Sequence, residues 1–264
     1  MTTGTKRISS HDIELGQGPV GCFLIHGFTG STYELQGLAE FLANQGFRVR
    51  AKLLAGHGTT IEECNLVRAH EWLEETEFHL TEFMLEGHTT FLIGLSMGAG
   101  LALHLARIFP VAGVVAMSPS LLLDSWKMRW LVPLLAPFVK AMPKARVYGQ
   151  GDLEKHPYFG YPSYPLRGLR ELIKLNKYIR GRLQEVTVPT LVMHTRTDLT
   201  APFENATYVH DTIQSKDKTL IDYSDKSHVL PDGSGKEQVW ADILDFLTPI
   251  IHEQDHAVPI HEPR

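Results

Sequence analysis

One serine stands in a setting that can make it reactive. Residues 94–98 read GLSMG and match the pattern G-x-S-x-G, with Ser96 at the centre. In this pattern the serine occupies a strained, sharp turn between a strand and a helix, and the glycines let those two elements approach closely. The apolar β-type run Thr89–Leu95 precedes Ser96, and the small-residue helical stretch Met97–Phe109 follows it. This context predicts that Ser96 is a nucleophile rather than part of an ordinary glycine-rich turn.

A serine hydroxyl is a poor nucleophile unless a base removes its proton and an acid orients that base. Where a serine stands in such a strand-to-helix turn, these groups follow in the chain order serine, acid, histidine. We predict Asp198 as the acid, just after the β-type run 190–194, and His228 as the base, just beyond the run 219–223. Both lie where strands end, which is the edge at which open α/β sheets gather their sites.

Three other residues compete for these roles. Asp225 could orient the histidine, but it lies only three residues from His228 in the same loop. Asp222 falls within a predicted strand, and His194 precedes the acid in chain order. The sequence therefore favours Asp198 and His228.

Acyl transfer also needs two preorganised N–H donors for the oxyanion. Residues 26–30 read HGFTG directly after the first apolar run, and we predict the backbone N–H groups of Phe28 and Met97 as the two donors. An ordinary glycine turn would explain the two glycines of HGFTG, but not why this segment occurs together with GLSMG in the same chain. We expect His26 to brace its loop, and the GHG run at 56–58 to be structural or to line the pocket.

The elements that must position these residues alternate between β-type runs and helical patterns. Such alternation predicts an α/β fold with a mostly parallel central sheet, flanked by helices. Ser31 and Glu34 have capping-box spacing at the start of the first helix, and Gly46 marks its end. The tail after Ile251 is expected to be frayed. The predicted strands are 19–25, 47–54, 89–95, 111–117, 190–194 and 219–223, and the predicted helices are 31–46, 72–85, 97–109 and 236–247.

Residues 120–183 interrupt the alternation with clustered prolines, aromatics and basic residues. We interpret them as a cap inserted between two parts of an α/β-hydrolase core, 1–119 and 184–264. The cap holds twelve Lys or Arg against four Asp or Glu, a net charge of +8, so the rest of a chain whose total is −5 carries −13. Trp126, Trp130 and Leu131 are expected to line a substrate pocket.

The mixed apolar and basic cap has two interpretations. Its apolar side chains could pack on the core while its basic ones are solvated or paired with the acidic body. Alternatively, the cap could admit acyl chains and make transient contact with an anionic lipid surface, where each basic residue contributes about 1 kcal/mol.

Composition excludes several function classes. A net charge of −5 argues against a nucleic-acid partner. The fourteen histidines show no paired metal-ligand spacing, so neither a metal nor an organic cofactor is expected. Of the two cysteines, Cys22 sits in an apolar run and is expected to be a buried free thiol. The sequence shows neither a signal-peptide core nor a membrane span, so a cytoplasmic protein is expected; the oligomeric state is not predicted.

Taken in order, the segments HGFTG, GHG, GLSMG, TRTDLTAP and SDKSH resemble those of bacterial carboxylesterases and monoacylglycerol lipases of the α/β-hydrolase superfamily. The resemblance spans almost the whole core but covers the cap weakly. It implies hydrolysis of carboxylic esters, with Ser96, Asp198 and His228 as the triad and Phe28 and Met97 as oxyanion donors. Short- to medium-chain acyl esters or monoacylglycerols are the expected substrates.

Other functions share this fold. Thioesterases and acyltransferases could use the same triad, and a ligand receptor could retain the triad but turn over slowly. Haloalkane dehalogenases and epoxide hydrolases normally carry an aspartate in place of Ser96, which argues against both.

Overall fold

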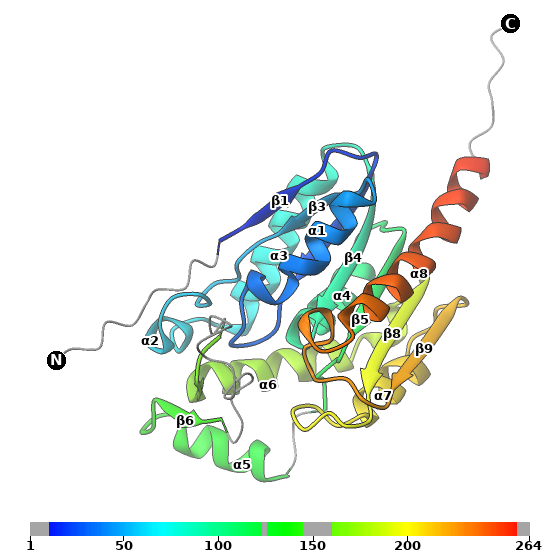
Figure 1. Cartoon of the computed structure of the whole chain (residues 1–264). Coiled ribbons are helices and arrows are strands. Elements are labelled where there is room, and N and C mark those ends of the chain that lie inside the picture. Colours follow the sequence, from blue (N-terminus) through cyan, green and yellow to red (C-terminus); the bar gives the residue numbers. More distant parts are fainter. Residues whose placement is uncertain (1–10, 123–125, 145–159, 258–264) are drawn as a thin grey trace, which may run out of the picture.

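The computed structural model describes residues 11–122, 126–144 and 160–257, without the side chains of 126–130 and 254–257. A seven-stranded sheet in the order β1-β3-β2-β4-β5-β8-β9 forms its centre (Figure 1). Only β1 is antiparallel to its neighbour. The strands are β1 Ile13–Leu15, β2 Val20–Ile25, β3 Arg48–Ala51, β4 Thr89–Leu95, β5 Gly113–Met117, β8 Thr190–Thr195 and β9 Lys218–Tyr223.

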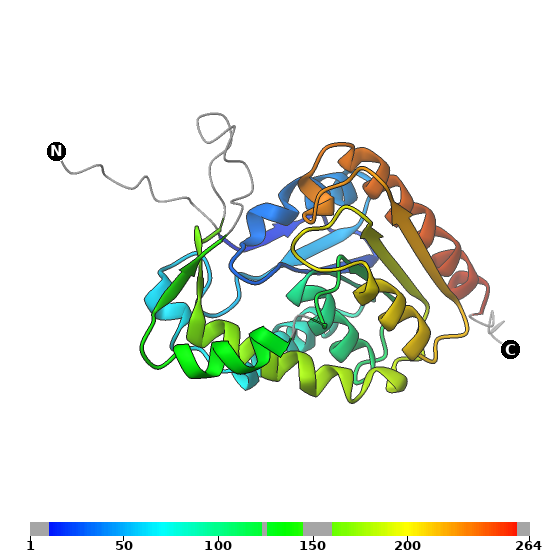
Figure 2. The same ribbon diagram turned by 90° about the horizontal axis from the view of Figure 1, so that it is seen from below.

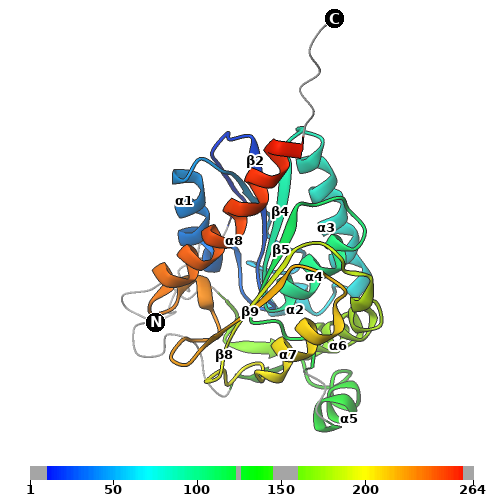
Figure 3. The same cartoon turned by 90° about the vertical axis from the view of Figure 1, so that its right-hand side faces the viewer.

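Helices cover both faces of this sheet (Figure 3). Because both faces are covered, the central strands β5 and β8 are buried at every position. One apolar cluster joins α1 and α8 to one face, and a second joins α3, α4, α6 and α7 to the other. The helices are α1 Gln36–Asn44, α2 Ile61–Cys64, α3 Ala69–Met84, α4 Met97–Ala106, α5 Trp126–Leu135, α6 Leu166–Arg180, α7 Glu204–Thr212 and α8 Lys236–Ala257.

The structure confirms the predicted mostly parallel sheet and corrects two details. The edge strand β1 was not predicted, because three residues are too short to show a clear alternation. The expected fraying after Ile251 is wrong as far as Ala257, where α8 ends. Buried Ile243, Leu247 and Ile250 recur at helical spacing, so one apolar face holds α8 against the sheet.

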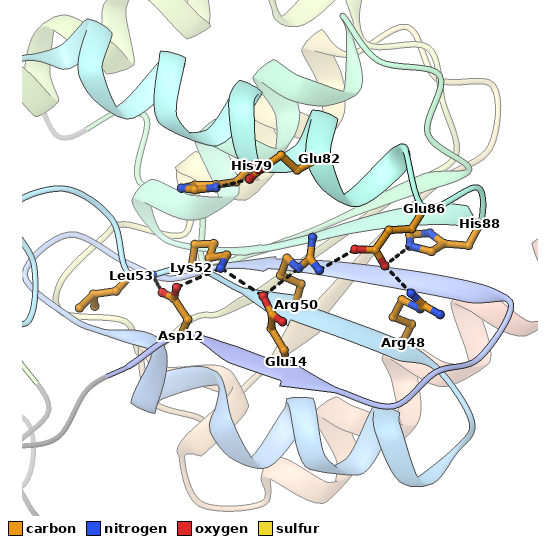
Figure 4. A network of polar contacts seen from close by, with 10 residues as sticks. All are labelled: Asp12, Glu14, Arg48, Arg50, Lys52, Leu53, His79, Glu82, Glu86 and His88. Carbon is orange, nitrogen blue, oxygen red and sulfur yellow. Dashed lines mark hydrogen bonds and ion pairs between the residues drawn. The ribbon is translucent and has the colours of Figure 1, made fainter.

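Charged side chains tie the edge strand β1 to β3 and to the end of α3 (Figure 4). Lys52 Nζ lies 3.0 Å from Asp12 and 3.1 Å from Glu14, and Arg50 lies 3.3 Å from Glu14. Arg48 and Arg50 both pair with Glu86. Charges along an edge strand discourage pairing with another chain, so this network protects the open edge of the sheet.

The segment between β5 and β8, here called the inserted segment (residues 120–183), carries α5 and α6. It also holds a separate two-stranded antiparallel sheet, β6 Ala141–Pro143 and β7 Ser163–Pro165. Its helices α5 and α6 lie beyond the edge to which the arrowheads of β8 and β9 point (Figure 1), with α5 alongside α6 (Figure 2). The amphipathic helix α6 buries Leu169, Leu172 and Leu175 against the core. The division of the chain at residues 119 and 183 stays a prediction.

Candidate active site

The turn between β4 and α4 places Ser96 in a conformation that side chains rarely adopt. Its backbone has φ 57° and ψ −112°. A Cβ on Gly94 would lie 2.1 Å from the carbonyl oxygen of Gly98, and one on Gly98 would lie 2.1 Å from that of Ile25. Strand, turn and helix can pack this closely only because both positions lack a side chain. The predicted strained turn around Ser96 is therefore present.

His228 lies within hydrogen-bond distance of Ser96, although 132 residues separate them in the chain. Its Nε2 is 3.1 Å from Ser96 Oγ. His228 sits in the loop between β9 and the short helix η3 (Leu230–Asp232), and its backbone carbonyl accepts a 2.8 Å hydrogen bond from Ser118 Oγ. Ser118 directly follows β5. The end of β5 therefore holds in place the loop after β9, in which His228 lies.

The carboxylate of Asp198 accepts a hydrogen bond from Nδ1, the other ring nitrogen of His228. Its Oδ2 lies 2.6 Å from His228 Nδ1, and its Oδ1 accepts the backbone N–H groups of Thr200 at 2.7 Å and Ala201 at 3.0 Å. Burial alone would raise the pKa of Asp198, but hydrogen bonds from His194 and His228 and the charge of His228 hold it well below its ordinary value. The carboxylate is therefore charged at neutral pH.

The two competing acids lie elsewhere. The Asp225 side chain is exposed and 3.7 Å from Lys226. Asp222 pairs with Arg196 at 2.5 Å. The structure thus brings Asp198 to His228 and keeps both rivals away.

The HGFTG loop packs directly against the turn that carries Ser96. A Cβ on Gly27 would lie 3.3 Å from Ser96 Cβ. Met97 is the first residue of α4, where backbone N–H groups have no acceptor within the helix. Phe28 follows Gly27 in the loop, so the two predicted oxyanion donors come from adjacent segments. No ligand marks the oxyanion position, and the donor role of both groups stays a prediction.

His26 braces its loop, as the sequence predicts. Its Nδ1–H donates to the carbonyl of Gly27 at 2.9 Å, and its Nε2 accepts the N–H of Leu54 at 3.1 Å. Burial lowers the pKa of His26 to about 4. Burial and the charge of His26 lower the pKa of His57 to about 3, and the His57 ring lies 5.8 Å from that of Phe28. Both imidazoles are therefore neutral at pH 7.

Glu34 has a position that the sequence did not predict. The expected capping box is wrong, because Ser31 accepts from the N–H of Tyr33 rather than from that of Glu34. The Glu34 carboxyl instead turns back to accept the N–H of Gly27 at 3.3 Å and lies against Gly30, where a Cβ would be 2.2 Å from Oε2. Burial raises the pKa of Glu34 to about 8. The sequence around Glu34, STYELQG, is mostly polar and carries no signal of this contact.

The predicted pocket residues have different outcomes. The side chains of Trp126 and Trp130 lie outside the described residues. Leu131 is 48% exposed on α5. The ring of Phe28 packs against that of Trp72 at 5.9 Å, with Gly168 of α6 beside it. A pocket role for Trp126, Trp130 and Leu131 stays a prediction.

Neither a metal site nor a membrane span is found in the part of the chain that the structure covers. Within residues 11–122, 126–144 and 160–257, no group of three or more His, Cys, Asp or Glu side chains could hold a metal ion. Among these same residues, no helix is long and apolar enough to cross a membrane. Cys22 and Cys64 are both buried free thiols.

Comparison with known proteins identifies relatives over most of the chain. The family model described as serine aminopeptidase, S33, matches residues 20–232. The thermostable monoacylglycerol lipase of Bacillus sp. strain H-257 is 28% identical over 226 residues, which span 80% of this chain and 84% of the lipase. The carboxylesterase of Bacillus subtilis strain 168 is 24% identical over 87% of this chain and 93% of its own length.

The fold also matches solved structures. A structure from work on the metagenome-derived lipolytic enzymes LipS and LipT superposes with a TM-score of 0.82 at 26% identity. The match covers 91% of this chain and 98% of that one.

Proposed function

The chain belongs to the serine aminopeptidase S33 family of α/β-hydrolases, and from this premise we propose that it is a serine carboxylester hydrolase with Ser96 as its nucleophile. The observation that carries the proposal is the unbroken series of hydrogen bonds from Ser96 Oγ to His228 at 3.1 Å and from His228 to Asp198 at 2.6 Å. The lipase and esterase relatives favour an ester over other acyl substrates.

The proposed reaction has two acyl-transfer steps. His228 Nε2 takes the proton of Ser96 Oγ as that oxygen attacks the ester carbonyl, and the same histidine then protonates the departing alcohol. Water, activated by His228, attacks the acyl-enzyme and releases the carboxylic acid. The chain supplies every group that these proton transfers require.

Asp198 and the two N–H donors stabilise the charges that develop in this reaction. The charged carboxylate holds the proton of His228 on Nδ1, so that Nε2 faces Ser96 as a base. The N–H groups of Phe28 and Met97 would bind the oxyanion. Removing one such donor typically costs about 2.7–4 kcal/mol of transition-state stabilisation.

Short- to medium-chain acyl esters or monoacylglycerols are the proposed substrates, and the inserted segment is the proposed cap that selects them. Its exposed apolar side chains support a further proposal, transient contact with an anionic lipid surface beside the basic residues of the segment. These side chains are 38–84% exposed and comprise Leu131, Leu134, Leu135, Phe138, Val139 and Met142.

Sedimentation with liposomes that contain or lack anionic lipid tests the contact. We expect binding to the anionic vesicles, weakened by a Leu134→Ser/Phe138→Ser variant. Equal and negligible sedimentation with both vesicles would contradict it.

Hydrolysis of p-nitrophenyl esters and of monoacylglycerols tests the function. We expect Ser96→Ala to lose nearly all activity, because no other nucleophile can form the acyl-enzyme. Ser234→Ala, at an exposed serine, is the matched control and should retain wild-type activity. Retained turnover in Ser96→Ala would refute the proposal, and faster turnover of acyl thioesters than of oxyesters would redirect it toward a thioesterase.

A further inference from the structure

A second histidine contacts the proposed triad acid. His194 lies near the end of β8, fully buried, and its Nε2 is 3.1 Å from Asp198 Oδ2 and 3.0 Å from the carbonyl oxygen of Ala201. The same Oδ2 lies 2.6 Å from Nδ1 of His228. One carboxylate oxygen therefore lies within hydrogen-bond distance of two imidazole rings.

The surroundings of His194 determine which ring nitrogen carries its proton. Both neighbours of Nε2 are oxygen acceptors, the carboxylate of Asp198 and the carbonyl of Ala201. Nδ1 is buried without a hydrogen-bond partner among the described residues, and the ring of Phe203 lies 5.8 Å away. An N–H at Nε2 satisfies two acceptors, whereas one at Nδ1 would satisfy neither. His194 is thus a donor toward Asp198.

Four donors then hold the Asp198 carboxylate. The backbone N–H groups of Thr200 and Ala201 bind Oδ1, while His194 and His228 bind Oδ2. The backbone donors come from the loop of the aspartate itself. His194 is the only one of the four that reaches the carboxylate from a strand of the sheet, so it ties the position of Oδ2 to the rigid core.

We propose that His194 is a positioning residue of the hydrolase, and that its Nε2–H holds Asp198 Oδ2 in line with Nδ1 of His228. The inference rests on the proposed function, since it assigns His194 an effect exerted through the triad. A different account is that His194 only joins the end of β8 to the Ala201 turn. That account predicts loss of stability but no dependence on Asp198.

Three substitutions separate these accounts. In His194→Gln the amide nitrogen can take the place of Nε2 and still donate to Asp198. In His194→Asn the shorter side chain puts the amide near the place of Nδ1, out of reach of Asp198, and His194→Phe removes the donor while filling the space. Glutamine and asparagine carry the same amide group, so they form a matched pair.

We expect kcat for p-nitrophenyl ester hydrolysis to fall roughly 10-fold or more in His194→Asn and His194→Phe, with KM within about 2-fold of wild type, because a hydrogen bond to a charged group is lost. His194→Gln should restore kcat to within about 3-fold of wild type, because the same bond is retained. Thermal unfolding of each variant shows whether it folds. Unchanged kcat in folded Asn and Phe variants would overturn the inference.

A double-mutant cycle with Asp198→Ala provides the decisive readout. If His194 acts through Asp198, adding His194→Phe to Asp198→Ala should lower the residual kcat by less than about 2-fold, because coupled positions are not additive. An equal loss in both backgrounds would show a purely structural role and refute the inference.

The rate at which a fluorophosphonate labels Ser96, measured on the same variants, separates the two proposals. A wild type that is labelled but hydrolyses no ester contradicts the ester hydrolase, while slower labelling of His194→Asn than of His194→Gln still supports the positioning role. Equal labelling and equal kcat of that pair would overturn the positioning role alone.

Discussion

The turn around Ser96 and the inserted segment differ in how much freedom their packing leaves. All ten residues of α4, behind Ser96, are buried, and Gly94 and Gly98 have no room for a single carbon. On α5 and just after it, Leu134 is 65% and Phe138 84% exposed. The proposed nucleophile thus lies in a tightly packed turn. The inserted segment, which is proposed to select the substrate, exposes side chains that can be substituted at little cost to stability.

The largest expected effect comes from a single methyl group at Gly98. Its Cβ would lie 2.1 Å from the carbonyl oxygen of Ile25, so Gly98→Ala should abolish ester hydrolysis and destabilise the fold by about 1–3 kcal/mol or more. Gly181→Ala in the inserted segment is the control, because the added Cβ would lie no closer than 3.7 Å to its nearest neighbour, the carbonyl oxygen of Tyr178. Equal kcat values and equal denaturation midpoints for the two variants would contradict the difference in packing between the turn around Ser96 and the inserted segment.

A second effect, on stability and not on catalysis, separates two leucines. Leu101→Ala, at a fully buried position of α4, should lower the free energy of unfolding by about 2–5 kcal/mol. Leu134→Ala, at a 65% exposed position of α5, should change it by no more than about 0.5 kcal/mol. Urea denaturation measures both, and a comparable loss at Leu134 would mean that the inserted segment packs as tightly as the core.

The third expected effect depends on pH and concerns Glu34, which accepts a hydrogen bond from the proposed oxyanion loop. The pKa of Glu34 in the folded chain is about 8, above the ordinary value of 4.5. Between these two pH values the folded chain binds more protons than the unfolded chain. Glu34 therefore makes the free energy of unfolding fall as the pH rises. The charge of Lys144 opposes the raised pKa, and that of Asp232 adds to it.

Glu34→Gln should therefore flatten the fall in Tm between pH 5 and 8 by removing the Glu34 contribution. Glu40→Gln, on the exposed face of α1, should leave the profile unchanged. A Glu34→Gln profile that is as steep as that of wild type would show that Glu34 does not titrate in this range.

The success of the sequence-based predictions also differs between the turn around Ser96 and the inserted segment. The strand Thr89–Leu95 was predicted to the residue, because a buried strand followed by G-x-S-x-G leaves one arrangement of turn and helix. Asp198 and His228 are predicted because each follows a strand, and parallel strands bring their carboxyl ends to one edge of the sheet; the structure places the two side chains in contact. Local pattern and chain order together suffice for groups that the sheet itself positions.

The sequence does not predict two short-range contacts near the site, those of Glu34 with Gly27 and of His194 with Asp198. The Glu34 spacing indicated a capping box, but burial of the carboxyl beside Gly27 and Gly30 overrode that local preference. Chain order argues against His194 as the base because it precedes the acid, yet its position near the end of β8 brings it to Asp198. The sequence of the inserted segment does not show which side chains line a pocket, so the roles of Trp126 and Trp130 stay predictions.

Covalent capture at the nucleophile tests the central claim most directly. A p-nitrophenyl alkylphosphonate should release one p-nitrophenol per chain and leave one phosphonyl group, which peptide mass spectrometry should locate on Ser96. The adduct should be absent from Ser96→Ala and form far more slowly in His228→Ala, which lacks the base. An adduct on another residue, or equally fast labelling of Ser96→Ala, would contradict Ser96 as the nucleophile.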